Sequence, residues 1–143
     1  MMEAGEEFVG GFAGGFLAKG ASTGYGIYAT TSRIIGVNVV KVGARSFLGG
    51  GMAGLVKGEL LPKLAPAESA AVIAELDEKR DFDIRKEQIS GIELKGPGLF
   101  GSGHLVISTI AGENTRIRLL HKVAFERLKD LMQVFDPDVV TLS

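Results

Sequence analysis

One stretch of the chain, residues 80–135, changes its hydrophobic period once and thereby limits the folds available to it. Four short segments alternate apolar and polar residues, as half-buried strands do: 81–85, 92–95, 104–110 and 115–120. After Leu120 the apolar residues recur at a spacing of about 3.6 instead, and Asp136-Pro137 ends that pattern. The stretch predicts an antiparallel meander followed by one amphipathic helix that packs its apolar stripe on the strands.

Length and composition exclude several classes of protein. With 143 residues the chain fits a single domain, 1–143, that can bury an ordinary core. The absence of cysteine excludes disulfides and thiolate chemistry, and two histidines are too few for a histidine-rich metal site, so we expect neither a metal nor a cofactor. The net charge of −1 argues against nucleic acid as a partner. No positively led hydrophobic segment opens the chain, which predicts a cytoplasmic protein.

Glycine is concentrated in the first half of the chain. Of 21 glycines, 15 lie between Gly5 and Gly58. Residues 8–16 repeat a Phe-x-Gly-Gly step, which we interpret as a strand curved at its glycines. Such a strand places Phe8, Phe12 and Phe16 on one face, where we expect them to fill a core; an aromatic ligand surface is the alternative. Two further strands are predicted at residues 25–31 and 33–37.

The hairpin at residues 27–36 carries a Thr-x-x-Arg-Ile pattern ending in Arg33-Ile34. This hairpin, the later strands and the terminal helix resemble those of bacterial and archaeal pleckstrin-homology-like domains. The resemblance covers roughly residues 5–37 and 80–135. It implies a mainly β, α+β fold: a bent antiparallel sheet or open barrel of about seven strands with a C-terminal capping helix. It also implies that a partner docks at the corner formed by the first, third and sixth inter-strand loops.

The chain departs from that family at residues 38–79, which we interpret as a glycine-rich, largely helical insertion between the third and fourth strands. A Gly-x-x-x-Gly-x-x-x-Gly series begins at Gly50. Arg45 and Lys57 bracket only 11 uncharged residues, whereas a membrane span needs about 20. A helix packed on the protein, a contact between identical subunits and a membrane-surface element remain open. Residues 67–78 then predict an amphipathic covering helix.

Two motifs could suggest chemistry. Residues 96–101 match Gly-x-Gly-x-x-Gly, but a strand rather than a helix follows, so we interpret them as a hairpin connection. Asp81 and Asp83 share a strand face, and His104 could act as a base, yet no triad is implied by their spacing. We therefore expect no enzymatic activity, and a small hydrolase built on His104 and Asp83 is the weakest alternative.

The leading interpretation is a non-enzymatic binding or assembly module for a protein partner or for a second copy of the chain. The alternative is a peripheral binder of anionic membranes, located at the inner face of the membrane. Arg116 and Arg118 project from one strand face and form a small basic patch with Lys122. The candidate binding residues are Lys19, Arg33, Arg45, Phe47, Leu48, Leu55, Lys57, Arg116 and Arg118.

Overall fold

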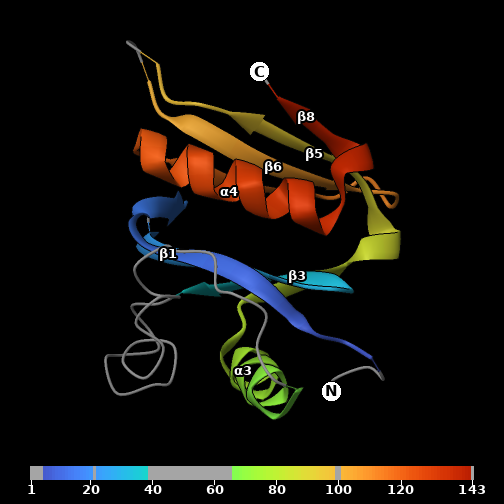
Figure 1. The fold of residues 1–143 in the computed structure, drawn as a ribbon. Helices are drawn as coiled ribbons and strands as arrows, with labels where there is room; N and C mark the ends of the chain where they lie inside the picture. The colour runs from blue at the N-terminus through green and yellow to red at the C-terminus, as the bar shows by residue number, and fades with distance from the viewer. Residues whose placement is uncertain (1–4, 21, 39–65, 99–100, 143) are drawn as a thin grey trace.

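The computed structural model describes residues 5–20, 22–38, 66–98 and 101–142 (Figure 1). Within them the chain is mainly β with two α-helices, which confirms the predicted α+β class. The strands are β1 (Phe8–Lys19), β2 (Ser22–Thr30), β3 (Arg33–Asn38), β4 (Phe82–Arg85), β5 (Ile89–Lys95), β6 (Gly103–Thr109), β7 (Asn114–Leu119) and β8 (Val140–Leu142). The helices are α3 (Pro66–Lys79) and α4 (Lys122–Phe135), and short 3-10 turns cover Lys86–Gln88 and Pro137–Val139.

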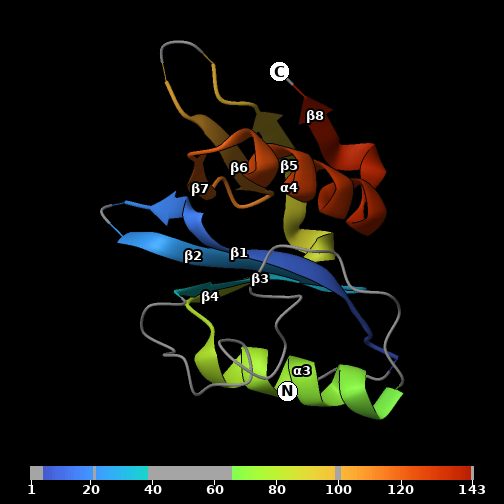
Figure 2. The ribbon, with the colours of Figure 1, turned by 60° about the vertical axis from the view of Figure 1, so that its left-hand side comes forward.

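The strands form one open sheet in the order β4-β3-β2-β1-β7-β6-β5-β8. Every pairing is antiparallel except that of β8 with β5. The ladder between β1 and β7 is short, pairing Leu17 with Leu119 and Ala18 with Arg118, and the sheet turns at this junction into two halves. Figure 1 shows β1 and β3 below α4 and β5, β6 and β8 above it, and Figure 2 shows all of β1–β4 below α4.

The main core lies between the two halves and is covered by α4. Five residues on one face of α4 are buried there: Ala124, Leu128, Leu131, Met132 and Phe135. They meet the inward residues of both halves, including Ile27, Ile107 and Ile117. The predicted terminal helix and the predicted alternation of β6 and β7 are confirmed, since Leu105, Ile107, Ile117 and Leu119 are all fully buried.

A second, smaller core lies on the opposite face of β1–β3, between these strands and α3. Figure 2 shows α3 packed on the lower side of these strands. Val72, Ile73 and Leu76 of α3 are fully buried against Tyr28 and Ile35. This confirms the predicted covering helix. Both faces of the β1–β3 half are therefore buried, which explains why apolar and polar residues do not alternate regularly along these strands.

The prediction that Phe8, Phe12 and Phe16 share one face is wrong. β1 is irregular against β2 between Phe8 and Gly10 and again between Gly14 and Ala18. A bulge puts an extra residue into a strand and changes the face of those that follow. Phe8 packs in the core beneath α3, Phe12 packs in the main core, and Phe16 is 44% exposed.

Two further differences concern the connections. The sequence did not predict β8, whose three residues are too few to display a period and which is the eighth strand of an expected seven. Of the predicted insertion, Asn38 ends β3 and Pro66–Lys79 forms α3, while 39–65 lie outside the described residues. The glycine string at 96–101 does connect two strands, with a bridge between Gly98 and Gly101.

Some glycines of the β1–β3 half leave space for aromatic rings that lie flat on the sheet. A Cβ at Gly11 would overlap Cδ1 of Tyr28, and one at Gly26 would lie 2.7 Å from Cε2 of the same ring. Tyr28 is fully buried, so its ring has no free volume to move into. Glycine therefore acts here through its missing side chain, because a larger residue would displace Tyr28.

We expect Gly11→Ala to lower the free energy of unfolding by about 1–3 kcal/mol, as overpacking does elsewhere. Gly15→Ala in the same strand is the matched control, since nothing lies within 4 Å of a Cβ at that position. Urea unfolding of both variants measures the difference. Equal stability of the two variants would show that the Tyr28 ring does not depend on the glycine.

Candidate functional site

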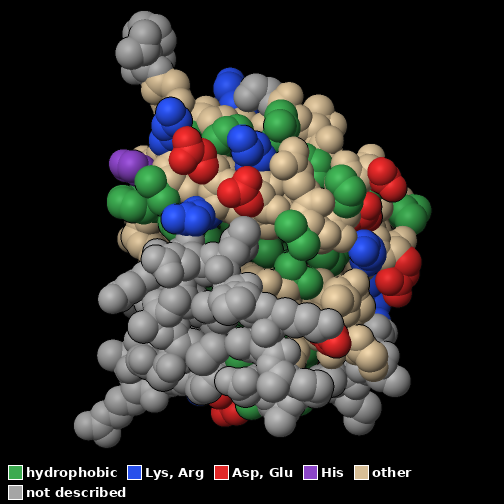
Figure 3. Space-filling view, in the orientation of Figure 1, with side chains coloured by type: hydrophobic (Ala, Val, Ile, Leu, Met, Phe, Trp, Pro, Cys, Tyr) green, Lys and Arg blue, Asp and Glu red, His purple; other side chains and the backbone are tan. Residues whose placement is uncertain are grey.

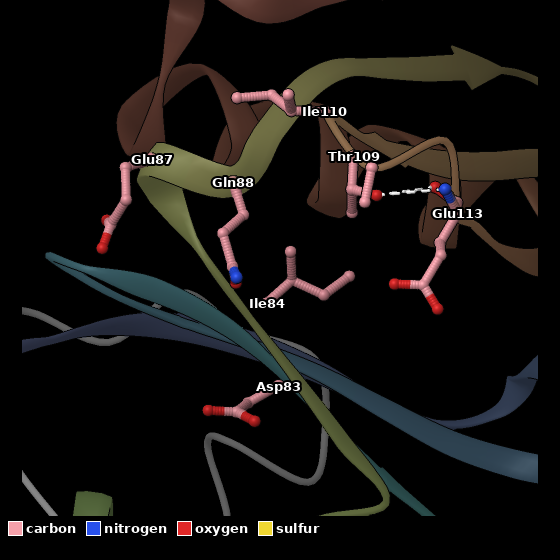
Figure 4. A pocket seen from close by; sticks show the side chains of 8 residues that line it. Asp83, Ile84, Glu87, Gln88, Thr109, Ile110 and Glu113 are labelled. Atoms are coloured by element: carbon pink, nitrogen blue, oxygen red, sulfur yellow. Dashed lines mark hydrogen bonds between the residues drawn. The ribbon is translucent and has the colours of Figure 1, made fainter.

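A cleft of about 420 Å³ opens where the sheet fails to close, between β4 and the β6–β7 turn. Apolar residues and carboxylates share its lining: Asp83, Ile84, Glu87, Gln88, Thr109, Ile110, Ala111 and Glu113. Figure 4 shows Ile84 and Gln88 pointing into this space and Glu113 extending toward it from the turn. The volume lies within the range of small ligand sites, roughly 300–1,000 Å³.

Local hydrogen bonds hold the two walls of the cleft together. Gly112 has φ +91°, a conformation that glycine adopts readily, and closes the β6–β7 turn by donating to Thr109 O at 2.9 Å. The Thr109 hydroxyl donates to Glu113 O at 3.2 Å and accepts from Glu113 N–H at 3.1 Å. Ile110 N–H donates to Gln88 O at 2.9 Å, which joins this turn to the 3-10 turn after β4. Hydrogen bonds therefore join the β6–β7 turn and the 3-10 turn that border the cleft.

The chemistry of the cleft suits a cation carried on an apolar stem. Ile84, Ala111 and Ile110, which is 74% exposed, supply the apolar surface. Within the described residues, the Glu87 and Glu113 carboxylates take part in no ion pair. A lysine or arginine side chain can lay its methylenes on apolar surface and extend its charge to such a carboxylate.

Beside the cleft, Arg33 forms the centre of a buried ion cluster. Its guanidinium is 2.9 Å from Glu6 Oε2, 2.7 Å from Asp77 Oδ1 and 3.1 Å from Asp83 Oδ2. These three carboxylates come from the segment before β1, from α3 and from β4, and Arg80 adds a second cation 2.9 Å from Asp77. One side chain therefore connects three elements that are distant in sequence.

Hydrogen bonds in this cluster favour the charged form of its members. Burial alone raises the pKa of Glu6, but hydrogen bonds from Arg33, Thr30 and Ser32 outweigh it and hold that pKa below its usual 4.5. The hydrogen bonds from Arg33 likewise hold the pKa of Asp77 below its usual 3.8. The bonds to Asp77, Glu6 and Asp83 raise the pKa of Arg33 despite its burial. Glu6, Asp77 and Arg33 are thus ionised at neutral pH.

Arg33 differs from the surface binding residue that the sequence suggested. It is 4% exposed, and its donors are directed to the three carboxylates. Arg33 is the one charged residue of a predicted strand that continues with Ile34 and Ile35. That isolated charge was the one signal in the sequence for a buried ion pair. Glu6 and Asp77 carried no signal, because only the fold brings them to Arg33.

The other candidate residues lie at the end of β1, on the neighbouring strand β7, or outside the described residues. Lys19 Nζ lies 3.6 Å from Asp81 Oδ2, and the Tyr25 hydroxyl donates to the same carboxylate at 2.5 Å. Arg116 and Arg118 are exposed on the outer face of β7, as predicted. The remaining five fall outside the described residues: Arg45, Phe47, Leu48, Leu55 and Lys57.

His104 and Asp83, the residues of the suggested hydrolase, have different partners and do not contact each other among the described contacts. His104 Nε2 lies 2.5 Å from Glu93 Oε2, and its Nδ1 lies 3.3 Å from Arg116 Nη2. Asp83 instead pairs with Arg33 and, at 3.9 Å, with Arg80. Of the loops expected to form the docking corner, the third ends at Asp81, which pairs with Lys19 at the end of β1, whereas the sixth contacts Gln88 in the β4–β5 connection. Residues 39–65 of the third loop lie outside the described residues.

Replacing Arg33 with methionine should lower the free energy of unfolding by about 3–5 kcal/mol, because three carboxylates would lose their shared cation in a buried site. Adding Glu6→Gln and Asp77→Asn should restore part of the loss. Arg116→Met, which removes an exposed arginine from a strand, is the control and should cost under about 1 kcal/mol. Urea unfolding of the parent chain and of the three variants gives the four free energies of unfolding. A similar loss for Arg33→Met and Arg116→Met would refute the structural role of the cluster.

The cluster also makes the free energy of unfolding depend on pH. Because the folded-state pKa values of Glu6 and Asp77 are depressed, their contribution is complete above the unfolded values of 4.5 and 3.8 and is lost as pH falls through the lower folded values. Stability should therefore decline below about pH 4.5 in urea unfolding measured at successive pH values. Glu6→Gln should flatten that decline, while Glu126→Gln, at an exposed position of α4, should leave it unchanged. An identical slope in Glu6→Gln and the parent chain would contradict the assignment.

Two classes of site find no support within the described ranges. No group of three or more histidine, aspartate or glutamate side chains in these ranges is arranged to hold a metal ion. No described helix combines the length and apolar character that crossing a membrane requires.

No protein-family model, curated protein or solved structure matches the chain.

Proposed function

We propose that this chain is a non-enzymatic binding module of the pleckstrin-homology-like type that docks a basic segment of a partner protein in the cleft between β4 and the β6–β7 turn. The strand order and the C-terminal helix are compatible with the resemblance seen in the sequence. The observation that carries the proposal is the cleft itself, whose lining combines apolar residues with Glu87 and Glu113.

The charge and shape of the cleft favour a protein segment with a lysine or arginine. Asp83 already shares Arg33 and Arg80, so Glu87 and Glu113 remain for an incoming cation. The neighbouring Lys86 does not neutralise them, because its Nζ lies 5.1 Å from the centroid of the Phe135 ring in the main core. An anionic ligand would meet like charge here.

The edge of β4 supplies main-chain groups for an extended segment. Lys86, which follows β4, donates its N–H to the carbonyl oxygen of Ser32, which precedes β3. Alternate residues of an antiparallel strand direct their main chains to opposite sides. Arg85 N–H accordingly faces away from β3, where it donates to Gln88 Oε1 at 3.3 Å. By the same alternation we expect Asp83, which pairs with Ile35 in register, to direct its N–H and C=O away from β3. A short extended peptide can pair there while its basic side chain enters the cleft.

The test uses fluorescently labelled decapeptides with one central lysine or arginine and their glutamate counterparts, measured by anisotropy at low and high salt. Basic peptides should bind and the acidic ones should not. A Glu87→Gln, Glu113→Gln double variant should weaken binding about tenfold or more, the effect of losing a charge-assisted hydrogen bond. Glu126→Gln, with a similarly exposed carboxylate on α4, should bind as the parent does. Equal affinity of parent and double variant would refute the cleft as the site.

A second copy of the chain is the other protein partner that the sequence suggests. Light scattering distinguishes the two cases without a peptide. A mass near that of one chain, unchanged by the double variant, is expected if the partner is another protein. A dimer that the double variant converts to a monomer would assign the cleft to self-association instead.

A further inference from the structure

The side chain of Gln88 takes the place of a neighbouring strand at the open edge of β4. In the described part of the chain β4 ends the sheet, so one of its edges has no strand beside it. Arg85 N–H, which faces away from β3, donates to Gln88 Oε1 at 3.3 Å. A strand added antiparallel to this edge would offer a main-chain carbonyl oxygen to the same N–H. Gln88 therefore supplies from a side chain the acceptor that a docked segment would supply from its main chain.

This contact can open without disturbing the turn that carries it. Its length of 3.3 Å exceeds the usual value of about 2.9–3.0 Å for an N–H···O bond, and Gln88 is exposed. The main chain of the 3-10 turn is held independently of the side chain: Ile110 N–H donates to Gln88 O at 2.9 Å, and Ile89 N–H donates to Lys86 O. The Gln88 side chain can therefore rotate while its backbone stays in place.

Gln88 also borders the cleft. Figure 4 shows its side chain reaching back toward β4 between Glu87 and Ile84. Figure 3 shows acidic, basic and hydrophobic side chains close together at the right-hand edge, where Figure 1 places the β4–β5 connection. A segment whose basic side chain reaches Glu87 therefore has to pass Gln88. It pairs with Asp83 alone if Gln88 stays, and with Asp83 and Arg85 if Gln88 moves.

Replacing Gln88 by a main-chain carbonyl changes little at Arg85. Both acceptors are uncharged amide oxygens, so one hydrogen bond replaces another of similar strength, and the released Gln88 amide becomes hydrated. A segment that pairs at both residues also fixes its register, because residues two apart in an extended chain lie opposite Arg85 and Asp83. Displacement of Gln88 thus lengthens the pairing without leaving Arg85 N–H unpaired.

We propose that Gln88 determines which basic segments the cleft accepts: an extended segment displaces the Gln88 side chain and pairs its main chain with Arg85 as well as Asp83. The inference rests on the proposed function and adds a requirement to it. A lysine or arginine on a helix can bring its charge to Glu87 and Glu113, but its main-chain groups are bonded within the helix. Such a segment leaves Gln88 in place, so the partner is an extended segment of at least three residues.

Amide hydrogen exchange in the free chain, followed by NMR, tests the contact itself. Gln88→Met keeps an unbranched side chain but removes the oxygen acceptor, so the Arg85 amide should exchange about fivefold faster than in the parent chain. Gln133→Met, at an exposed position of α4, is the control and should leave that rate unchanged. An Arg85 amide that exchanges equally fast in the parent chain and in Gln88→Met would overturn the proposal. Circular dichroism of both variants verifies that the fold is retained.

Peptide binding tests the displacement. The lysine decapeptide should bind Gln88→Met about fivefold more tightly than it binds the parent chain, because no existing hydrogen bond has to be exchanged. Two further decapeptides carry N-methyl groups on alternate amides, one on the odd-numbered and the other on the even-numbered residues. Only alternate N–H groups of an extended segment face the edge of a sheet. One of the two peptides should therefore lose affinity about tenfold, and the other should bind as the unmodified peptide does.

The outcomes separate this proposal from the proposed function. Equal affinity of the parent chain and Gln88→Met, or of the two methylated peptides, would overturn the role of Gln88 and leave the cleft as the binding site. Failure of every basic peptide to bind the parent chain would overturn both proposals. Tighter binding to Gln88→Met, together with a loss for one methylated peptide alone, is the result that supports displacement.

Discussion

The charge cluster around Arg33 is the interaction on which the arrangement of the β1–β4 half depends. A buried guanidinium needs carboxylate partners, and here they come from the segment before β1, from α3 and from β4. The same cluster positions β4, the edge strand that forms one wall of the cleft. Asp83 belongs both to the cluster and to the cleft lining, which couples the packing of α3 to the shape of the proposed binding site.

Close packing on both faces of this half imposes the second constraint. Tyr28 lies flat over Gly11 and Gly26 beneath α3, and Phe82 lies over Gly36 on the opposite face. The concentration of glycine in the first half of the chain is thus explained in part by the aromatic rings that take the space of missing side chains. The irregularities in β1 follow the same logic, because they distribute three regularly spaced phenylalanines over two cores and the surface.

The sequence predicted what local periodicity determines. The alternation of β6 and β7, the stripe of α4 and the face of α3 depend on neighbours along the chain, and all were confirmed. Strand pairing is different: the β1 bulges depend on register against β2, and β8 forms only because β5 offers an edge. Arg116 and Arg118 could be predicted as exposed from alternation alone. The cleft could not, since it forms between β4 and a turn about 25 residues later, and the carboxylates of Arg33 come from segments with no pattern of their own.

Amide hydrogen exchange is the most direct test of whether Arg33 joins α3 and β4 to the rest of this half. In the parent chain, the amides of α3 and β4 should be protected nearly as strongly as those of β2 and β3. In Arg33→Met, α3 and β4 should lose protection first, while β5, β6, β7 and α4 keep theirs. Weak protection of α3 in the parent chain, or a uniform loss across the whole sheet in the variant, would contradict the account.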